Sequence, residues 1–321
     1  MKKETRVMRD ALIECLYEKM LANDSIFFIS ADFGAPALDR LRATFPDRFI
    51  NVGIAEQNLV NIATGLALEG YTVYAYAIAP FLSMRAYEQI RTNLSILSQV
   101  RPLNVNLVGV GAGLSYDVTG PTHHCLEDTC IMTVLPNFTV CSPSDAVLTE
   151  KLVDFTLSRK SPKYLRLDGK AQPNLYRDDE PVDFGKGFHE LRKGGDVGIV
   201  STGYMTHVAL GIAAQLAKEG LECGVVDVFF LKPLDHDALF RSLNRYKLVV
   251  SMEESFINKG SLDTIVEDVL YTSGFNTRLL KIGFSDKYVF EVGDRAYLHK
   301  VNGLDPEQIL SAILNSLSKA E

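Results

Sequence analysis

One stretch decides the fold: Asn51-Val-Gly-Ile-Ala-Glu56-Gln57-Asn-Leu-Val-Asn-Ile-Ala-Thr-Gly65-Leu-Ala-Leu-Glu-Gly70. It joins a short apolar run to an apolar helix and places one carboxylate, Glu56, at the junction. A helix N-terminus favours a negative side chain, which is the ordinary explanation of such a position. The helix also carries the small residues Ala63, Gly65 and Ala67, which permit close approach of another backbone. We therefore expect this helix to pack against another subunit, with Glu56 out of water at that interface.

Short apolar runs alternate with amphipathic segments along the rest of the chain. The expected buried strands of the first half are 25–30, 48–53, 71–76, 104–109 and 164–167. Those of the second half are 197–200, 223–229, 247–250 and 279–282, with helices over about 205–219 and 306–318. This alternation predicts an α/β protein of two tandem domains, each a mostly parallel sheet flanked by helices.

The alternation lapses between the two halves. Residues 171–190 are polar and contain prolines, with few apolar side chains to bury. We interpret them as a linker between a first domain, 1–170, and a second, 191–321. A chain of 321 residues is long enough for two such domains.

Composition excludes several classes of function. The net charge of −7 disfavours a nucleic-acid or anionic-membrane partner, because either would favour a basic face. The first residues lack the apolar core of a secretory signal, and no run reaches the roughly 18 apolar residues of a membrane span. The five cysteines form no Cys-x-x-Cys pair, which indicates a reducing cytoplasm and no metal site in this chain.

The chemistry of a buried carboxyl suggests a role for Glu56. Desolvation raises a carboxyl pKa, and a raised pKa suits a group that shares a proton with a weakly basic ring nitrogen. The run Gly53-Ile-Ala-Glu56-Gln57, with Gly-Leu-Ala about ten residues on, resembles the pyrimidine-binding domain of transketolase and of deoxyxylulose-phosphate synthase. The resemblance implies a thiamine diphosphate cofactor and makes Glu56 the catalytic group that controls the tautomer of its aminopyrimidine ring.

A second segment resembles the part of that family that surrounds the pyrimidine ring. It runs Pro80-Phe81-Leu-Ser-Met84-Arg-Ala-Tyr87-Glu-Gln-Ile-Arg91. The resemblance assigns cofactor binding to Phe81, Met84 and Tyr87, with Met84 where many transketolases place a phenylalanine. A thioether can still cover an aromatic face. Because the three residues share a helical face, plain helix core is the alternative explanation.

Two adjacent histidines follow a glycine–proline turn in Thr119-Gly120-Pro121-Thr122-His123-His124. Gly-Pro-Thr-His resembles the transketolase motif whose histidine contacts the donor sugar, a task suited to a group that hydrogen-bonds or exchanges a proton near neutral pH. The resemblance gives the catalytic role to His123 and a substrate contact to His124. Thr119 stands where transketolases usually have an aspartate, which leaves the donor sugar open.

Two arginines match positions that bind a sugar phosphate in this family. Arg9 lies in the first expected helix, and Arg166 lies near the end of the strand at 164–167. A planar guanidinium meets phosphate oxygens with two hydrogen bonds and stays charged. Ion pairing at the surface is the alternative for both, and the strand end favours Arg166 because ligands bind there in parallel sheets.

One expected part of the active site is missing from the sequence. Lys232-Pro-Leu-Asp235 and the pair Glu253-Glu254 resemble the C-terminal domain of the same family, where we expect the glutamates to be structural. However, no Gly-Asp-Gly with a downstream Asn occurs, and Gly194-Gly195-Asp196 begins a strand without that Asn. The resemblance thus implies the C-terminal subunit of a split transketolase, which self-associates and needs an N-terminal subunit to hold Mg²⁺ and the diphosphate.

Three alternatives remain open at this point. One is the beta chain of a 2-oxo-acid dehydrogenase decarboxylase component, and another is half of a deoxyxylulose-phosphate synthase. The third is a scaffold subunit without activity, which Thr119 and Met84 favour and which Glu56, His123 and Arg166 together disfavour. The phosphate arginines favour a sugar phosphate substrate.

Overall fold

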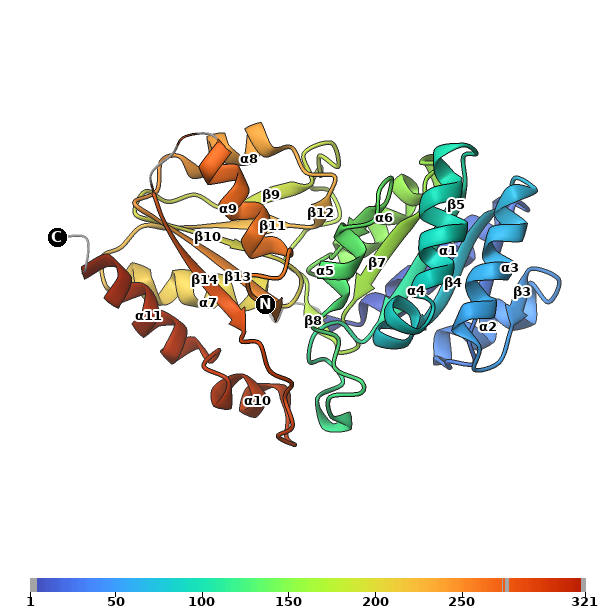
Figure 1. Cartoon of the computed structure of the whole chain (residues 1–321), viewed down its shortest axis with the longest axis horizontal. Helices are drawn as coiled ribbons and strands as arrows, with labels where there is room; N and C mark the ends of the chain where they lie inside the picture. The colour runs from blue at the N-terminus through green and yellow to red at the C-terminus, as the bar shows by residue number, and fades with distance from the viewer. Residues whose placement is uncertain (1–4, 273, 275–276, 319–321) are drawn as a thin grey trace.

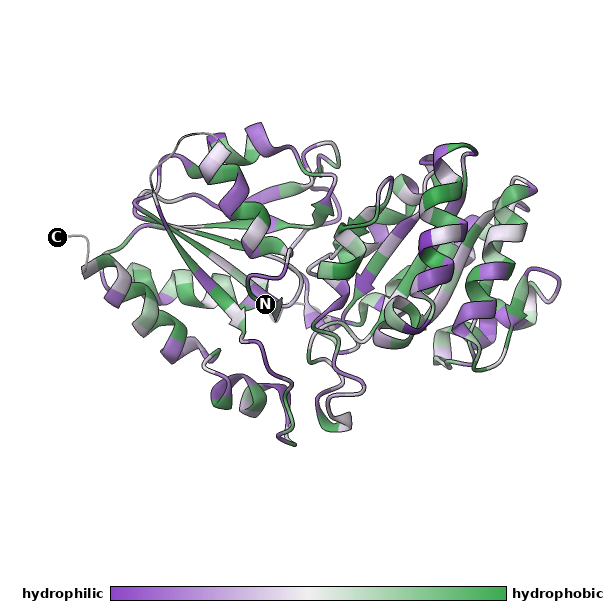
Figure 2. Cartoon of the chain, viewed as in Figure 1, coloured by the Kyte–Doolittle hydropathy of each residue, from purple (hydrophilic) through white to green (hydrophobic). Residues whose placement is uncertain are grey.

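Two sheets lie side by side along the molecule, one in each half of the chain (Figure 1). The computed structural model describes residues 5–272, 274 and 277–318. The predicted fold class is confirmed: each sheet is mostly parallel and is flanked by helices. Figure 2 shows strands that are largely hydrophobic and helices that carry both hydrophobic and hydrophilic residues, as expected when helices cover the faces of a buried sheet.

The first sheet has seven strands in the order β12-β6-β7-β5-β4-β2-β3. Its strands are β2 (Ile26–Ser30), β3 (Phe49–Asn51), β4 (Thr72–Ile78), β5 (Asn104–Val110), β6 (Thr139–Cys141), β7 (Lys163–Leu167) and β12 (Phe230–Lys232). Neighbouring strands are parallel except β12, which pairs antiparallel with β6. The five strands expected in the first half are all present. The short strands β6 and β12 were not expected, and β12 comes from the second half of the chain.

The helices of the first half surround this sheet. They are α1 (Met8–Ala22), α2 (Pro36–Thr44), α3 (Glu56–Leu68), α4 (Tyr87–Gln89), α5 (Asp128–Thr133) and α6 (Ala146–Ser158). Two π-helical segments, η1 (Phe81–Arg85) and η2 (Ile90–Ile96), flank α4, and the 3-10 turns η3 (Leu97–Gln99) and η4 (Asp117–Thr119) follow. A two-residue pair, β1 (Thr5–Arg6) with β8 (Gln172–Pro173), ties the chain start to the end of this half.

The second sheet has five strands in the order β14-β13-β10-β11-β9. They are β9 (Phe188–Arg192), β10 (Val197–Ser201), β11 (Cys223–Val228), β13 (Leu248–Phe256) and β14 (Arg278–Phe284), with β9 antiparallel at the edge. Its helices are α7 (Met205–Lys218), α8 (His236–Leu243), α9 (Leu262–Thr272), α10 (Arg295–Val301) and α11 (Pro306–Ser318). The segment 171–190 contains β8 and the start of β9, so it is partly ordered into strands.

Helix α3 packs inside its own chain. Ala63 and Ala67 are buried against the sheet, whereas Gly65 is exposed and a side chain there would meet no other atom. The small residues therefore serve two faces, one packed in this chain and one open. In the described part of the chain, no helix combines the length and apolar character that crossing a membrane requires.

Candidate active site

The predicted site residues follow the carboxyl ends of neighbouring parallel strands, where ligands bind in such sheets. Glu56 comes after β3, and Phe81 comes after β4. The loop 111–124, which carries His123, comes after β5. The strand order places β4 between β2 and β5, with β3 beyond β2. Sheet topology thus gathers segments that are distant in sequence along one edge.

Glu56 is the first residue of α3, and its side chain is buried. Gly53, with a φ of +74°, turns the chain between β3 and the helix in a conformation that favours glycine. The side-chain carbonyl of Asn51 accepts a hydrogen bond from the Gly53 N–H at 3.0 Å and steadies this turn. Glu56 is 3% exposed, so burial by its own chain is enough to remove it from water.

The buried carboxylate has a cationic partner that the sequence did not reveal. Nη1 of Arg85 donates to Oε2 of Glu56 at 2.7 Å. The side chain of Arg85 is 48% exposed, against 4% for that of Glu56. Arg85 lies 29 residues along the chain, so the pair forms only when α3 packs against η1.

A chain of contacts links three of the predicted site residues through Arg85. Its guanidinium carbon lies 4.7 Å from the centroid of the Phe81 ring. The Phe81 ring in turn meets the His123 imidazole edge to face, with centroids 5.1 Å apart. The structure therefore brings Glu56, Phe81 and His123 into one cluster, with Arg85 between the first two.

The two histidines have different surroundings. His123 is half-buried, and its Nδ1 lies 3.0 Å from Oγ1 of Thr122. His124 is buried, and its Nε2 lies 3.2 Å from the carbonyl oxygen of Asp117. His123 thus belongs to the cluster, whereas His124 fixes the loop that carries it.

Met84 and Tyr87 do not share the face that α-helical spacing predicts. The π-helical turn of η1 alters the register between them. Met84 is 38% exposed. The Tyr87 hydroxyl donates to the carbonyl oxygen of Ile131 in α5 at 2.8 Å, so this end of the side chain anchors η1 and α4 to a neighbouring helix.

The two candidate phosphate arginines differ in how accessible they are. Nε of Arg9 donates to Oδ1 of Asp10 at 2.8 Å, and its side chain is partly exposed. Arg166 is buried: its Nε donates to both oxygens of Asp128 at 3.1 and 2.9 Å. Its Nη2 donates to carbonyl oxygens of Cys125 and Glu254. A phosphate contact from Arg166 would require these bonds to break, so the structure favours Arg9.

A buried charge network joins the two halves beside this edge. Arg295 donates from Nε to Oε1 of Glu254 at 2.8 Å and from Nη1 to Oδ2 of Asp168 at 2.6 Å, and its Nη2 binds the second oxygen of Glu254. His299 Nε2 lies 2.5 Å from the same carboxylate. Burial opposes ionisation of Glu254, but Arg295 outweighs it and holds the pKa of this carboxyl well below its usual range. Glu254 therefore belongs to the junction of the halves.

The same network reaches the loop that carries His123. The Asp117 carboxylate accepts from the Arg295 backbone N–H at 2.8 Å and pairs with Lys170. Burial opposes ionisation of Asp117, yet these donors outweigh it and lower its pKa. Sequence reasoning missed this link, because partners as far apart as Arg295 and Asp168, 127 residues, carry no local signal.

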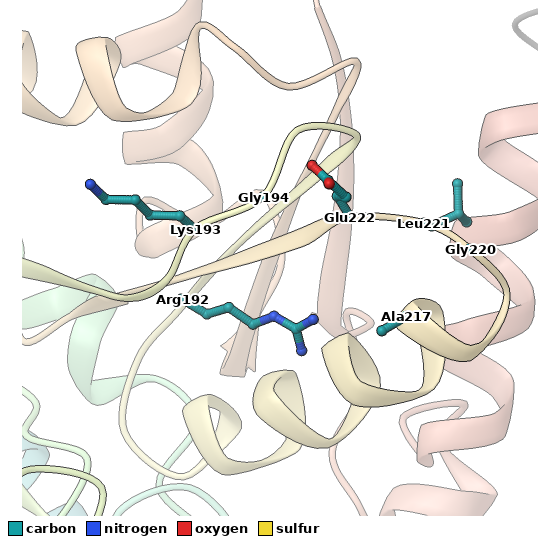
Figure 3. A pocket seen from close by; sticks show the side chains of 7 residues that line it. All are labelled: Arg192, Lys193, Gly194, Ala217, Gly220, Leu221 and Glu222. Atoms are coloured by element: carbon teal, nitrogen blue, oxygen red, sulfur yellow. The ribbon is translucent and has the colours of Figure 1, made fainter.

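No metal site emerges from the described residues 5–272, 274 and 277–318, where no group of three or more His, Cys, Asp or Glu side chains is placed to hold an ion. Asp196 is used structurally: it pairs with Lys247 at 2.8 Å and accepts from the Glu222 N–H. A surface pocket does open nearby, on the second sheet. Figure 3 shows its lining, Arg192, Lys193, Gly194, Ala217, Gly220, Leu221 and Glu222, which includes none of the predicted site residues.

Comparison with known proteins identifies both halves. The chain matches the family described as transketolase, pyrimidine binding domain, over residues 4–172 and that described as transketolase, C-terminal domain, over residues 187–309. One of the two named subunits of the apulose-4-phosphate transketolase of Actinobacillus succinogenes is 35% identical over 84% of this chain and 85% of that protein. The 6-deoxy-6-sulfo-D-fructose transketolase subunit SqwH of Clostridium sp. strain MSTE9 is 31% identical over 97% and 94%. A solved split gene transketolase, an inactive beta4 tetramer, superimposes with a TM-score of 0.85 and 32% identity, covering 98% of this chain and 99% of that one.

Proposed function

The chain belongs to the transketolase family, and from this premise we propose that it is the C-terminal subunit of a split, thiamine-diphosphate-dependent transketolase. It transfers a two-carbon ketol unit between sugar phosphates together with a second subunit. Two relatives of similar length are each named as a transketolase subunit, which supports this assignment. Residues 1–170 form its pyrimidine-binding domain and 191–321 its C-terminal domain, joined by 171–190.

The observation that carries the proposal is the buried Glu56 beside Phe81 and His123. The aminopyrimidine ring of thiamine diphosphate is flat and carries a basic ring nitrogen, so it needs an aromatic or apolar face and a carboxylate. These residues fit that requirement. When bound, the cofactor supplies a carbanion-stabilising centre for carbon–carbon bond cleavage and formation.

Each residue of the cluster has a role that follows from its surroundings. The Glu56 carboxylate holds the proton shared with the pyrimidine ring, and burial strengthens that hydrogen bond. Phe81 and Met84 cover the flat ring, while His123 donates or accepts hydrogen bonds at the sugar oxygens. Arg9 binds the sugar phosphate. Tyr87, His124 and Arg166 support these groups from behind through the bonds described above.

The partner subunit supplies what this chain lacks. A magnesium diphosphate needs several oxygen ligands in one place, and the sequence contains no Gly-Asp-Gly with a downstream Asn. We propose that an N-terminal subunit with this motif holds Mg²⁺ and the diphosphate, and that the assembly contains more than one copy of each chain. The described cysteines are all free thiols, which supports a reducing, cytoplasmic setting.

Product analysis of the reconstituted complex tests this function. The chain is combined with a diphosphate-binding subunit, Mg²⁺ and thiamine diphosphate, and is supplied either with a ketose phosphate and an aldose phosphate or with pyruvate. We expect two-carbon transfer between the sugar phosphates and no CO₂ from pyruvate. Release of CO₂ from pyruvate alone would indicate a decarboxylase component, and its release only with glyceraldehyde phosphate would indicate deoxyxylulose-phosphate synthesis.

A further inference from the structure

The residue that stands out beyond the proposed chemistry is Arg85. It pairs with the buried Glu56 at 2.7 Å, yet nearly half of its own side chain faces solvent. A buried carboxylate without a partner is costly, so the free chain needs a cation at this place. Arg85 provides it through a single hydrogen bond, and the rest of its guanidinium is not locked into the fold.

The same guanidinium lies over the Phe81 ring, with its carbon 4.7 Å from the ring centroid. It therefore contacts both groups assigned to the pyrimidine ring. A guanidinium is flat, positively charged and rich in N–H donors. A pyrimidine ring that shares a proton with Glu56 is likewise flat, and it presents an N–H to the carboxylate. The two groups match the same pair of contacts and cannot make both at once.

We propose that Arg85 is a positioning residue that holds Glu56 and Phe81 before the coenzyme binds and then gives up its place to the pyrimidine ring. This inference rests on the proposed role of Glu56. Its exposed side makes such an exchange possible without unfolding, since the side chain has water on one side to move into. Binding then exchanges one partner of the buried carboxylate for another, so that the carboxylate is never left alone.

The exchange has a measurable consequence for affinity. A ligand that binds only when a competing group has moved shows an apparent affinity reduced by the fraction of molecules in the competent arrangement. If about a tenth of the molecules have Arg85 displaced, removing its charge tightens binding by about tenfold. Arg85 thus sets a threshold for coenzyme binding while it protects the site.

Titration of thiamine diphosphate into the reconstituted complex, at saturating Mg²⁺ and followed by calorimetry, tests the exchange. We expect Arg85→Met to bind about tenfold more tightly than the native chain, and Arg85→Lys, which restores one donor, to fall between them. Arg91→Met is the matched control, because Arg91 lies on the same segment but pairs with the exposed Glu88, and it should bind as the native chain does. Unchanged or weaker binding by Arg85→Met would overturn the proposal.

A second readout uses the full chain alone and needs no coenzyme. Arg85→Met should lower the thermal midpoint by about 2–4 °C, and Glu56→Gln in the same chain should remove most of that loss, because the buried charge is then gone. Additive effects of the two substitutions would contradict the pairing. The failure of the proposed function looks different: Glu56→Gln would then leave turnover of the complex intact, whatever Arg85 does.

Discussion

Two buried glutamates in this molecule pair with arginine, and they do so in opposite ways. Glu254 binds Arg295 through both of its oxygens, and Asp168 and His299 complete the group. Glu56 binds Arg85 through one oxygen. The exposed fraction of the arginine side chain is 7% for Arg295 and 48% for Arg85.

The difference separates a structural pair from a functional one. A cation with several buried partners cannot leave without stranding charges in the interior, so Arg295 fixes how the two halves meet. A cation with one buried partner and one wet face can be replaced by a ligand that offers the same contact. The geometry of the cation, more than that of the glutamate, therefore distinguishes the two sites.

The largest expected effect is on activity. Glu56→Gln keeps the size of the side chain but cannot take or hold the proton, so turnover of the reconstituted complex should fall by about 10²- to 10⁴-fold. Arg85 stays half-solvated, so stability should change little. Steady-state assays together with sedimentation of the complex check both points. Full activity in Glu56→Gln would favour the scaffold explanation.

The next effect is on stability. Arg295→Met strands Glu254 and Asp168 in the interior and should reduce the free energy of unfolding by about 3–5 kcal/mol. Urea unfolding of the full chain measures it. Arg177→Met is the control, because Arg177 pairs with Asp179 at the surface, with both side chains more than three-quarters exposed, and it should change stability by less than about 0.5 kcal/mol. A loss as small as the control's would mean that Arg295 does not hold the halves together.

A third buried carboxylate sharpens the comparison through pH. Asp227 accepts hydrogen bonds from the hydroxyls of Ser144, Tyr176 and Thr206, and burial raises its pKa to about 6. Between the unfolded pKa near 4 and this value, the native state binds more protons than the unfolded state, so stability falls as pH rises through that window.

Asp227→Asn removes this dependence. Urea unfolding at pH 4 and at pH 7 should show the native chain losing up to about 3 kcal/mol relative to the variant over that interval. Glu254 provides the opposite sign: its pKa is lowered, so its contribution is present above the unfolded value and is lost as pH falls below it. Parallel pH profiles for the native chain and Asp227→Asn would contradict this account.

The smallest expected effect concerns Tyr87. Tyr87→Phe loses the hydrogen bond to the Ile131 carbonyl and should cost about 1 kcal/mol of stability. If the hydroxyl anchors the helix and does not bind the coenzyme, affinity for thiamine diphosphate should stay at the native value. A clear loss of affinity without a loss of stability would return Tyr87 to the pocket.

Local motifs predicted more than distant contacts did. Glu56 and His123 could be found because each lies in a short run whose turn residues and neighbours are contiguous. The apolar strands were found because buried parallel strands carry continuous apolar runs. The boundaries of α11 were predicted closely, since its pattern is strongly amphipathic.

The rest depended on tertiary structure. Arg85 stood inside the quoted pocket segment, but its pairing with Glu56 depends on how η1 packs against α3. The π-helical turn of η1 shifts the register that a 3.6-residue period assumes, which misplaced Tyr87. Strand β12 joins the sheet of the other half, and no local pattern shows which sheet a three-residue strand will join.

The central claim is that this chain carries one half of an active site. Its most direct test is to hold the chain at fixed concentration and titrate in the diphosphate-binding subunit, with Mg²⁺ and thiamine diphosphate present, while two-carbon transfer between sugar phosphates is followed. We predict no transfer by this chain alone and a rate that saturates at one partner per chain. Transfer at full rate without the partner would contradict the account.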